Sequence, residues 1–379
     1  MNASSVFSSR LRFFGLLLAC AMLAACSTAP SGTATKTSVP ADVTIAANDP
    51  AVRLSGRSEG AGTERVTFGW SGARMRLRFT GSASVAVRLE DESTNNYAAV
   101  WIDGVAQPKF RLDAADGIYR LADDLSDGEH TVEVVRLTEG HVGLTHFRGF
   151  VLAAGGTPLP WRETHARRIE FIGDSITCGY GVEVDDPKLH FEPATENFCL
   201  GYSGLTARTL DADYVVVSRS GIGMVRNYDG PRDGIPGDAV PAAYGRSLFL
   251  RPDSAWDFSR FTPDVVCVNL GTNDFSTSGV NVDLFVATYR TFVEQLLARY
   301  PKAQLVMLQG PMNTSPELRA ALDRVRAQLS PEVAPRVHFL ALTAQGSVGL
   351  GADYHPNRAQ SEINARELTT YLRELMGWK

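Results

Sequence analysis

Two hydrophobic patterns divide the chain. From about Val43 to Leu152 the apolar residues recur at every second position, most clearly over Arg74–Phe79, where apolar and basic side chains alternate. This alternation is typical of a half-buried strand. Short strands, frequent turns and no helical pattern predict an antiparallel, jelly-roll-like β-sandwich over residues 43–155. The further strands are predicted at Ser84–Leu89, Tyr97–Ile102, Gly117–Leu121 and His130–Leu137.

The pattern changes after a segment of small residues and proline at 153–158, and residues 156–167 are interpreted as a linker. From 168 to 379, apolar strand-like runs alternate with helical segments. This alternation predicts a three-layer α/β/α domain with a parallel sheet, whose chemistry would lie beyond the carboxyl ends of the strands. The strands are expected at Ile169–Ile172, Tyr214–Ser218, Val265–Leu270, Gln304–Gln309 and Val337–Leu342, and the helices at Leu284–Tyr300, from Pro316, and at Arg358–Met376.

The first 25 residues are typical of a signal peptide. Arg10 and Arg12 precede an apolar stretch at 13–25 that is too short for a permanent membrane span. The stretch ends in LAAC, which resembles the lipobox of bacterial lipoproteins and implies cleavage before Cys26 and lipidation of that cysteine. An ordinary signal peptide that happens to contain Cys26 is the alternative. Residues 26–42, rich in Ser, Thr, Ala and Pro, are predicted to form a disordered tether, so we expect an exported lipoprotein, membrane-anchored in the periplasm or at the cell surface.

Composition and cysteine content narrow the possible partners. Hydrophobic residues make up 44% of the chain and charged residues 21%, which indicates globular domains. Basic and acidic residues are interspersed, with a formal net charge of -5, so nucleic acid is excluded as an expected partner. Beyond Cys20 in the signal peptide and Cys26, three cysteines remain; Cys267 lies in a predicted buried strand, which makes Cys178–Cys199 a possible disulfide. No spacing predicts a metal site, and no cofactor is expected.

Four segments at strand ends could carry chemistry. Ser175 follows Gly173-Asp174 at the end of an apolar strand, where backbone N–H groups offer an oxyanion site; a helix N-cap is the alternative. Gly221 and Asn273 follow two later strands and offer a free backbone N–H and a side-chain amide as oxyanion donors, although each segment taken alone is ordinarily a turn. His355, better placed than His190, follows Asp353 by two residues and is a candidate general base.

The four segments together resemble the SGNH, or GDSL, hydrolase superfamily over about Arg168 to Lys379. The resemblance implies that Ser175 is the nucleophile, that Ser175, Gly221 and Asn273 form the oxyanion hole, and that His355 is the base. Most of the superfamily has an aspartate three residues before the histidine, where this chain has Ala352. The shorter Asp353 spacing, GDSITCGYG at the nucleophile, WDFSRF at Trp256 and the N-terminal sandwich are similar to carbohydrate esterase family 2.

This resemblance implies a metal-independent serine esterase that removes O-acetyl groups from a plant-type polysaccharide or oligosaccharide. The alternatives are a general lipase, arylesterase or thioesterase, and a catalytically silent glycan-binding surface lipoprotein. Tyr180, Tyr228, Tyr244 and Trp256 fall in or near the expected rim, where a ring could stack on a sugar, although Trp256 is better explained as core. Because residues two apart in an extended segment project to the same side, we expect the Asp353 carboxylate to orient His355, with a backbone carbonyl as the alternative.

Overall fold

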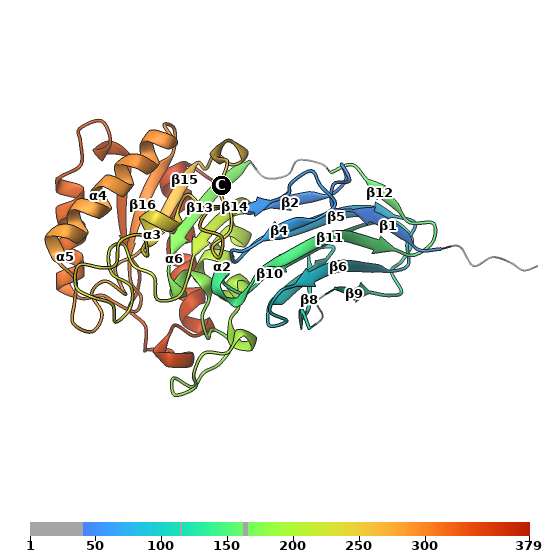
Figure 1. Cartoon of the computed structure of the whole chain (residues 1–379), viewed down its shortest axis with the longest axis horizontal. Helices are drawn as coiled ribbons and strands as arrows, with labels where there is room; N and C mark the ends of the chain where they lie inside the picture. The colour runs from blue at the N-terminus through green and yellow to red at the C-terminus, as the bar shows by residue number, and fades with distance from the viewer. Residues whose placement is uncertain (1–40, 114–115, 162–165) are drawn as a thin grey trace, which may run out of the picture. The chain divides into compact units, whose positions relative to one another are not determined.

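Two antiparallel sheets pack together in the first half of the computed structural model, which describes residues 41–113, 116–161 and 166–379 (Figure 1). Apolar side chains from both sheets share one core, in which Phe68, Leu77 and Phe147 are fully buried. The sandwich was therefore predicted correctly. One sheet contains β3 (Ser58–Glu59), β4 (Val66–Phe68), β11 (Thr145–Leu152), β6 (Val85–Asp91) and β9 (Gly117–Ala122), with β1 (Val43–Ala46) paired to β11; the other contains β12 (Thr157–Leu159), β5 (Arg74–Thr80), β10 (Glu129–Arg136), β7 (Tyr97–Ile102) and β8 (Val105–Arg111), with β2 (Arg53–Ser55) paired to β5.

Strand β5 departs from the prediction of a half-buried strand. Its basic face is buried as well as its apolar face. Arg74 pairs with Asp213 and lies 4.2 Å from the centre of the Tyr214 ring, and both partners belong to the second domain. Arg74 therefore contacts another domain rather than solvent, while Arg76 donates to Ser55 and Arg78 pairs with Glu129.

The second half of the chain forms a five-stranded parallel sheet in the order β14-β13-β15-β16-β17. Its strands match the five predicted ones closely, because each contains a short apolar run; four of these runs are buried on both faces, whereas the edge strand β17 is only partly buried. They are β13 (Arg167–Gly173), β14 (Ala212–Ser218), β15 (Val265–Asn269), β16 (Gln304–Gln309) and β17 (Val337–Ala341).

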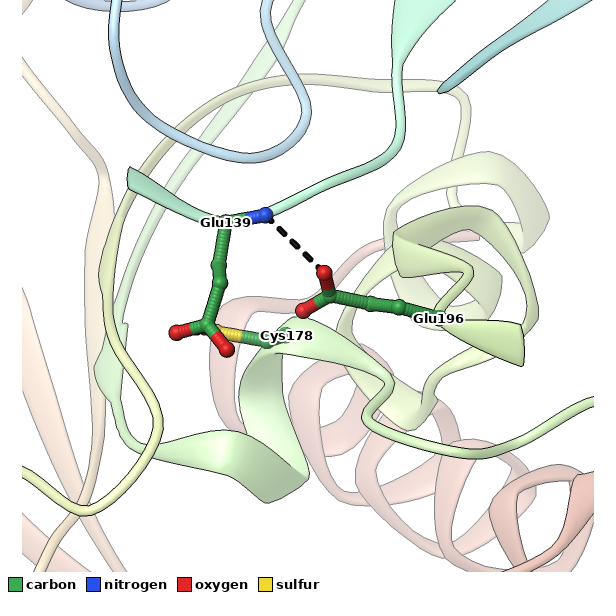
Figure 2. Close-up of side chains that lie close together, drawn as sticks. All are labelled: Glu139, Cys178 and Glu196. Carbon is green, nitrogen blue, oxygen red and sulfur yellow. Dashed lines mark hydrogen bonds between the residues drawn. The ribbon is translucent and has the colours of Figure 1, made fainter. Parts of the chain in front are cut away.

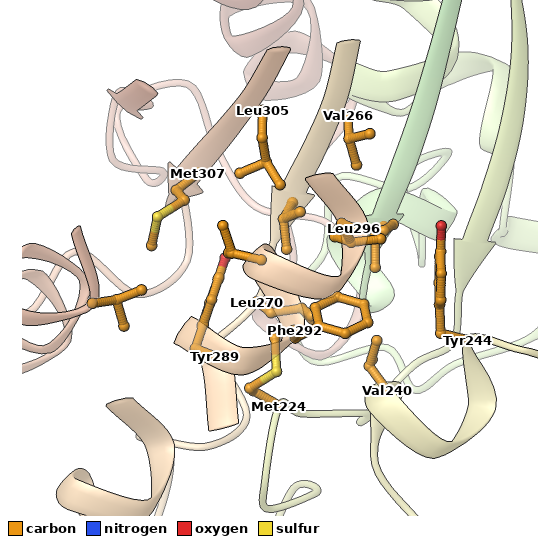
Figure 3. Close-up of a cluster of buried hydrophobic side chains, with 14 of the residues drawn as sticks. Met224, Val240, Tyr244, Val266, Leu270, Tyr289, Phe292, Leu296, Leu305 and Met307 are labelled. Atoms are coloured by element: carbon orange, nitrogen blue, oxygen red, sulfur yellow. The ribbon is translucent and has the colours of Figure 1, made fainter. Parts of the chain in front are cut away.

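Helices cover both faces of this sheet, as predicted. On one face α4 buries Phe285, Tyr289, Phe292 and Leu296 along a single stripe against β15 and β16, as Figure 3 shows for three of the side chains. On the other face α2 and α6 pack on β13 and β14. The helices are α1 (Ser175–Cys178), α2 (Tyr202–Thr209), α3 (Val240–Ala243), α4 (Val282–Arg299), α5 (Pro316–Ala327) and α6 (Arg358–Met376).

The described residues from 41 onward form one compact unit, so the two predicted domains contact each other directly. Arg57 of the sandwich illustrates it: the buried guanidinium donates to Glu170 of β13 at 2.9 Å. The predicted signal peptide, Cys26 and nearly all of the tether lie outside the described residues. Within the described part of the chain, none of the helices combines the length and the apolar character needed to cross a membrane.

Candidate active site

Ser175 lies where β13 ends. The strand runs to Gly173, and Ser175 is the first residue of α1. Asp174 caps this helix, because its carboxylate accepts a hydrogen bond from Ile176 N at 3.1 Å. The capping role considered for Ser175 is therefore filled by Asp174, and the serine hydroxyl is available for chemistry.

His355 is placed as a base for Ser175. Its Nε2 lies 2.8 Å from Ser175 Oγ, across 180 residues of sequence. Its Nδ1 lies 3.1 Å from the backbone oxygen of Asp353 and 3.2 Å from that of Ala352. Carbonyl oxygens only accept hydrogen bonds, so Nδ1 carries the proton and Nε2 presents its lone pair to the serine hydroxyl.

The predicted contact between the Asp353 carboxylate and His355 is wrong. Residues 352–354 form a 3-10 turn in which Asp353 and Tyr354 both have positive φ, 47° and 62°. The segment is not extended, so residues two apart do not project to the same side. The turn directs the backbone carbonyls at the imidazole instead, which is the alternative considered from the sequence.

The Asp353 carboxylate binds the loop that follows the nucleophile helix. Its Oδ2 accepts from Tyr180 OH at 2.5 Å and from Phe191 N at 2.9 Å, and its Oδ1 lies 2.9 Å from His190 Nδ1. The Tyr180 ring stacks on the His355 ring with 4.0 Å between centroids. Asp353 therefore acts on the base through the tyrosine that packs against it.

The two predicted oxyanion donors lie with Ser175 around one cavity. Gly221 has φ of 77°, a conformation that favours glycine, and its carbonyl accepts from Tyr228 N at 2.8 Å. Asn273 Nδ2 donates to Ile222 O at 2.9 Å and lies 3.3 Å from Asp174 Oδ2. The 3.3 Å contact with Asp174 is long, so the second amide hydrogen of Asn273 is only weakly bound. This hydrogen is the one that Asn273 could donate to an oxyanion.

The cavity measures about 610 Å³ and is lined mainly by polar side chains. Among the described residues that line it, Met312 is the only aliphatic side chain larger than alanine, and Tyr180 and Tyr228 are the aromatic ones. Tyr228 is 62% exposed, so its ring is accessible to a ligand. The remaining lining residues are Ser175, Ser220, Gly221, Thr272, Asn273, Ser276, Asn313, Asp353 and His355.

Burial governs the ionisation of the site. It lowers the pKa of His355 below its ordinary value, against the opposing effect of the two carbonyl contacts. Burial also raises the pKa of Asp174 to about 7, with a further contribution from the nearby Asp274 carboxylate. His355 is thus kept neutral, which a general base requires.

Comparison with known proteins identifies the family. Residues 54–161 match the carbohydrate esterase 2 N-terminal domain, and residues 171–363 match the GDSL-like lipase/acylhydrolase family. The chain is 30% identical over 340 residues to an acetylxylan esterase / glucomannan deacetylase of Cellvibrio japonicus, covering 88% of this chain and 92% of that protein.

The chain belongs to carbohydrate esterase family 2, within the GDSL-like hydrolases. It is also 34% identical over 341 residues to the cellulase/esterase CelE of Acetivibrio thermocellus; this match covers 87% of the chain but only 40% of that protein. A family two carbohydrate esterase from Clostridium thermocellum, solved in complex with cellohexaose, superposes with a TM-score of 0.81 at 32% identity, over 86% of this chain and all of that one.

The structure does not contain the possible Cys178–Cys199 disulfide. Cys178, Cys199 and Cys267 are all free thiols. Cys178 Sγ lies 3.2 Å from Ser218 Oγ in the interior, whereas Cys199 lines a separate surface hollow beside Arg208. The two sulfurs occupy different environments, which the sequence spacing could not reveal.

Two of the four candidate aromatic residues lie away from the rim. Tyr244 and Trp256 are each only 6% exposed and pack around the buried Arg57 guanidinium. Trp256 is therefore core, as favoured from the sequence. Tyr180 and Tyr228 are the pair that lines the cavity.

Sequence reasoning missed a buried acidic cluster behind the nucleophile. Within the described residues, one group has metal-ligating atoms that lie close together, all within 4.8 Å of one another: Glu139, Cys178 and Glu196 (Figure 2). These residues lie far apart in the sequence and Glu139 comes from the sandwich, so no motif could have signalled the cluster.

Proposed function

We propose that this chain is an exported, lipid-anchored serine esterase that removes O-acetyl groups from a plant-type polysaccharide or oligosaccharide. The observation that carries the proposal is the 2.8 Å contact between Ser175 Oγ and His355 Nε2, in a cavity that Gly221 and Asn273 also line. Nucleophile, base and oxyanion donors together are what acyl transfer from an ester requires.

The reaction proceeds in two steps. Ser175 Oγ attacks the ester carbonyl carbon while its proton passes to His355 Nε2, and the carbonyl oxygen becomes an oxyanion facing Ser175 N–H, Gly221 N–H and Asn273 Nδ2. Collapse breaks the bond to the sugar oxygen, which takes the proton from His355. Water then attacks the acetyl-serine with His355 as base, and acetate and free Ser175 result.

The cavity lining favours a small acyl group on a polar alcohol. A long acyl chain needs an apolar slot, and Met312 is the only long aliphatic side chain in the lining. The hydroxyls and amides of Ser276, Thr272 and Asn313 suit a polyhydroxyl ligand, and the exposed Tyr228 ring offers a stacking face for a sugar. The deacetylase and esterase names of the relatives support the same substrate class.

The membrane anchor rests on the sequence at residues 1–26 and is tested separately. A Cys26→Ala variant expressed in a bacterial host should lose labelling by a clickable fatty acid and move from the membrane fraction to the soluble fraction. Equal membrane association of the variant and the parent would overturn the anchor.

The activity is tested with purified protein and its Ser175→Ala variant on aryl acetate, aryl octanoate and acetylated xylan or glucomannan. We expect acetate release from the acetyl substrates, little turnover of octanoate, and a loss of about three orders of magnitude in the variant. Preference for octanoate would favour a general lipase, and absence of turnover on all substrates would favour a silent glycan-binding protein.

A further inference from the structure

Glu139 carries a carboxylate from the β-sandwich into the back of the active site. It lies in the connection between β10 and β11, just before the short 3-10 helix at Gly140–Val142, and its side chain is fully buried. Figure 2 shows the side chain beside Cys178 of α1 and Glu196. A residue of the N-terminal domain therefore reaches the elements that hold the nucleophile and the oxyanion donors.

One oxygen of this carboxylate contacts both catalytic segments. Glu139 Oε2 accepts a hydrogen bond from Ser220 N, the residue before the oxyanion donor Gly221. The same oxygen lies 3.8 Å from Cys178 Sγ, at the end of the helix that Ser175 begins, and 3.3 Å from His141 Nδ1. The oxyanion loop and the nucleophile helix thus share one acceptor.

Hydrogen bonds to its backbone N–H and backbone oxygen hold Glu139 in place. Its backbone N–H donates to Glu196 Oε2 at 3.1 Å, and its backbone oxygen accepts from the buried Arg136 guanidinium at 3.1 Å. Burial and the nearby Glu139 carboxylate raise the pKa of Glu196 well above its ordinary value. Although burial opposes it, hydrogen bonds from His141 and Ser220 keep the pKa of Glu139 below its ordinary value, so the negative charge of the pair resides on Glu139.

We propose that Glu139 is a positioning residue for catalysis, which holds the Arg219–Ser220 peptide and thereby the turn that presents the Gly221 N–H to the developing oxyanion. This inference rests on the proposed esterase function. Gly221 O and Ile222 O accept from Tyr228 N and Asn273 Nδ2. On the N-terminal side of this turn the backbone bonds are long, 3.4 Å from Arg219 N to Gly173 O and 3.3 Å from Ile222 N to Arg219 O, and the bond from Ser220 N to Glu139 adds a charged acceptor there. The sandwich domain therefore completes the active site rather than merely adjoining it.

A purely structural role for Glu139 predicts different behaviour from a positioning role. A buried carboxylate could simply join the two domains, as Glu133 does through its 2.6 Å contact with Arg208. In that case its loss would lower the melting temperature while the folded fraction kept its turnover. A positioning role instead lowers kcat and leaves KM nearly unchanged, because the lost interaction forms only in the transition state.

The test compares Glu139→Gln and Glu139→Asp in the full chain, with Glu133→Gln as the control for an interdomain carboxylate outside the site. Glutamine keeps an oxygen at the right reach to accept from Ser220 N but loses the charge, whereas aspartate keeps the charge but is one methylene too short. We expect kcat for aryl acetate to fall by about tenfold to a hundredfold in the aspartate variant, less in the glutamine variant, and not in the control.

Several outcomes overturn the proposal. One is a Glu139→Asp variant that is at least as active as Glu139→Gln. Another is a decrease in activity that is fully explained by a lower melting temperature. If the wild-type protein fails to hydrolyse acetyl esters, the proposed function fails by itself. Glu139 is then judged by the rate at which an aryl phosphonate labels Ser175, since its phosphonyl oxygen uses the same donors. Equal labelling rates in wild-type and both variants would reject the positioning role.

Discussion

Replacing Asp353 by asparagine separates a catalytic triad from a Ser175–His355 dyad. If the carboxylate held the His355 Nδ1 proton, the change would cost roughly ten-thousandfold in turnover, because an amide favours the wrong imidazole tautomer. In this structure two backbone carbonyls accept that proton, and the Asp353→Asn change leaves both in place. The expected loss is therefore far smaller.

The size of the loss follows from the contacts of the carboxylate. Asp353 Oδ2 accepts hydrogen bonds from both Tyr180 OH and Phe191 N. An asparagine whose side-chain oxygen takes the place of Oδ2 therefore keeps two of the three contacts. The third partner, His190, has a side chain 93% exposed and can turn its ring toward an amide NH2. What remains is the lost charge near the imidazolium, worth about 1 kcal/mol or less at a partly exposed position, which corresponds to roughly fivefold in rate.

The assay measures kcat and KM for aryl acetate with the wild-type, Asp353→Asn and Asp353→Ala proteins, together with melting temperatures. We expect asparagine to retain activity within about tenfold, and alanine to lose more because Tyr180 is no longer held against His355. A loss of several thousandfold in a stable Asp353→Asn protein would refute the dyad and reinstate the carboxylate as the orienting group.

Three further predictions concern the same site and its cysteines. Asn273→Ala should lower kcat by about a hundredfold with little change in KM, as loss of one oxyanion donor does, and steady-state kinetics with aryl acetate would show it. The acid limb of kcat/KM should lie below pH 6.5, because burial lowers the pKa of His355 from that ordinary value and activity needs the neutral ring; a limb above 6.5 would contradict this. Alkylation of denatured, unreduced protein should modify Cys178 and Cys199 separately, and a peptide linking them would show that the disulfide forms after all.

The parts of the site that the sequence predicts are those carried by local pattern. Three of the apolar runs that form parallel strands are followed directly by a functional segment, so Ser175, Gly221 and Asn273 could be assigned to strand ends from the sequence. His355 was a candidate base from its loop position and the nearby Asp353, and the resemblance to a family implied the same role. Their convergence in one cavity follows because the carboxyl ends of parallel strands meet at one edge of the sheet.

The parts that failed depend on backbone conformation or on distant partners. The Asp353 prediction assumed an extended segment, and two successive residues with positive φ at 353 and 354 invalidated it. No propensity predicts such a pair, because neither residue is glycine. The disulfide prediction used sequence position alone. The burial of Arg74 against β14 depends on a domain contact that alternation along a strand cannot reveal.

The choice of backbone carbonyls over a carboxylate has a chemical consequence for the base. A carboxylate bonded to Nδ1 stabilises the imidazolium and raises the pKa of the histidine, whereas a carbonyl orients the ring with only a partial charge. In this site the Asp353 carboxylate accepts a hydrogen bond from Tyr180 instead of from His355, and burial lowers the pKa of His355. Different groups thus orient the base and stabilise its charged form. Because the pKa of His355 is lowered, the base stays neutral at mildly acidic pH. The imidazolium that forms during attack is stabilised by more distant charges, such as those of Asp353 and Glu139.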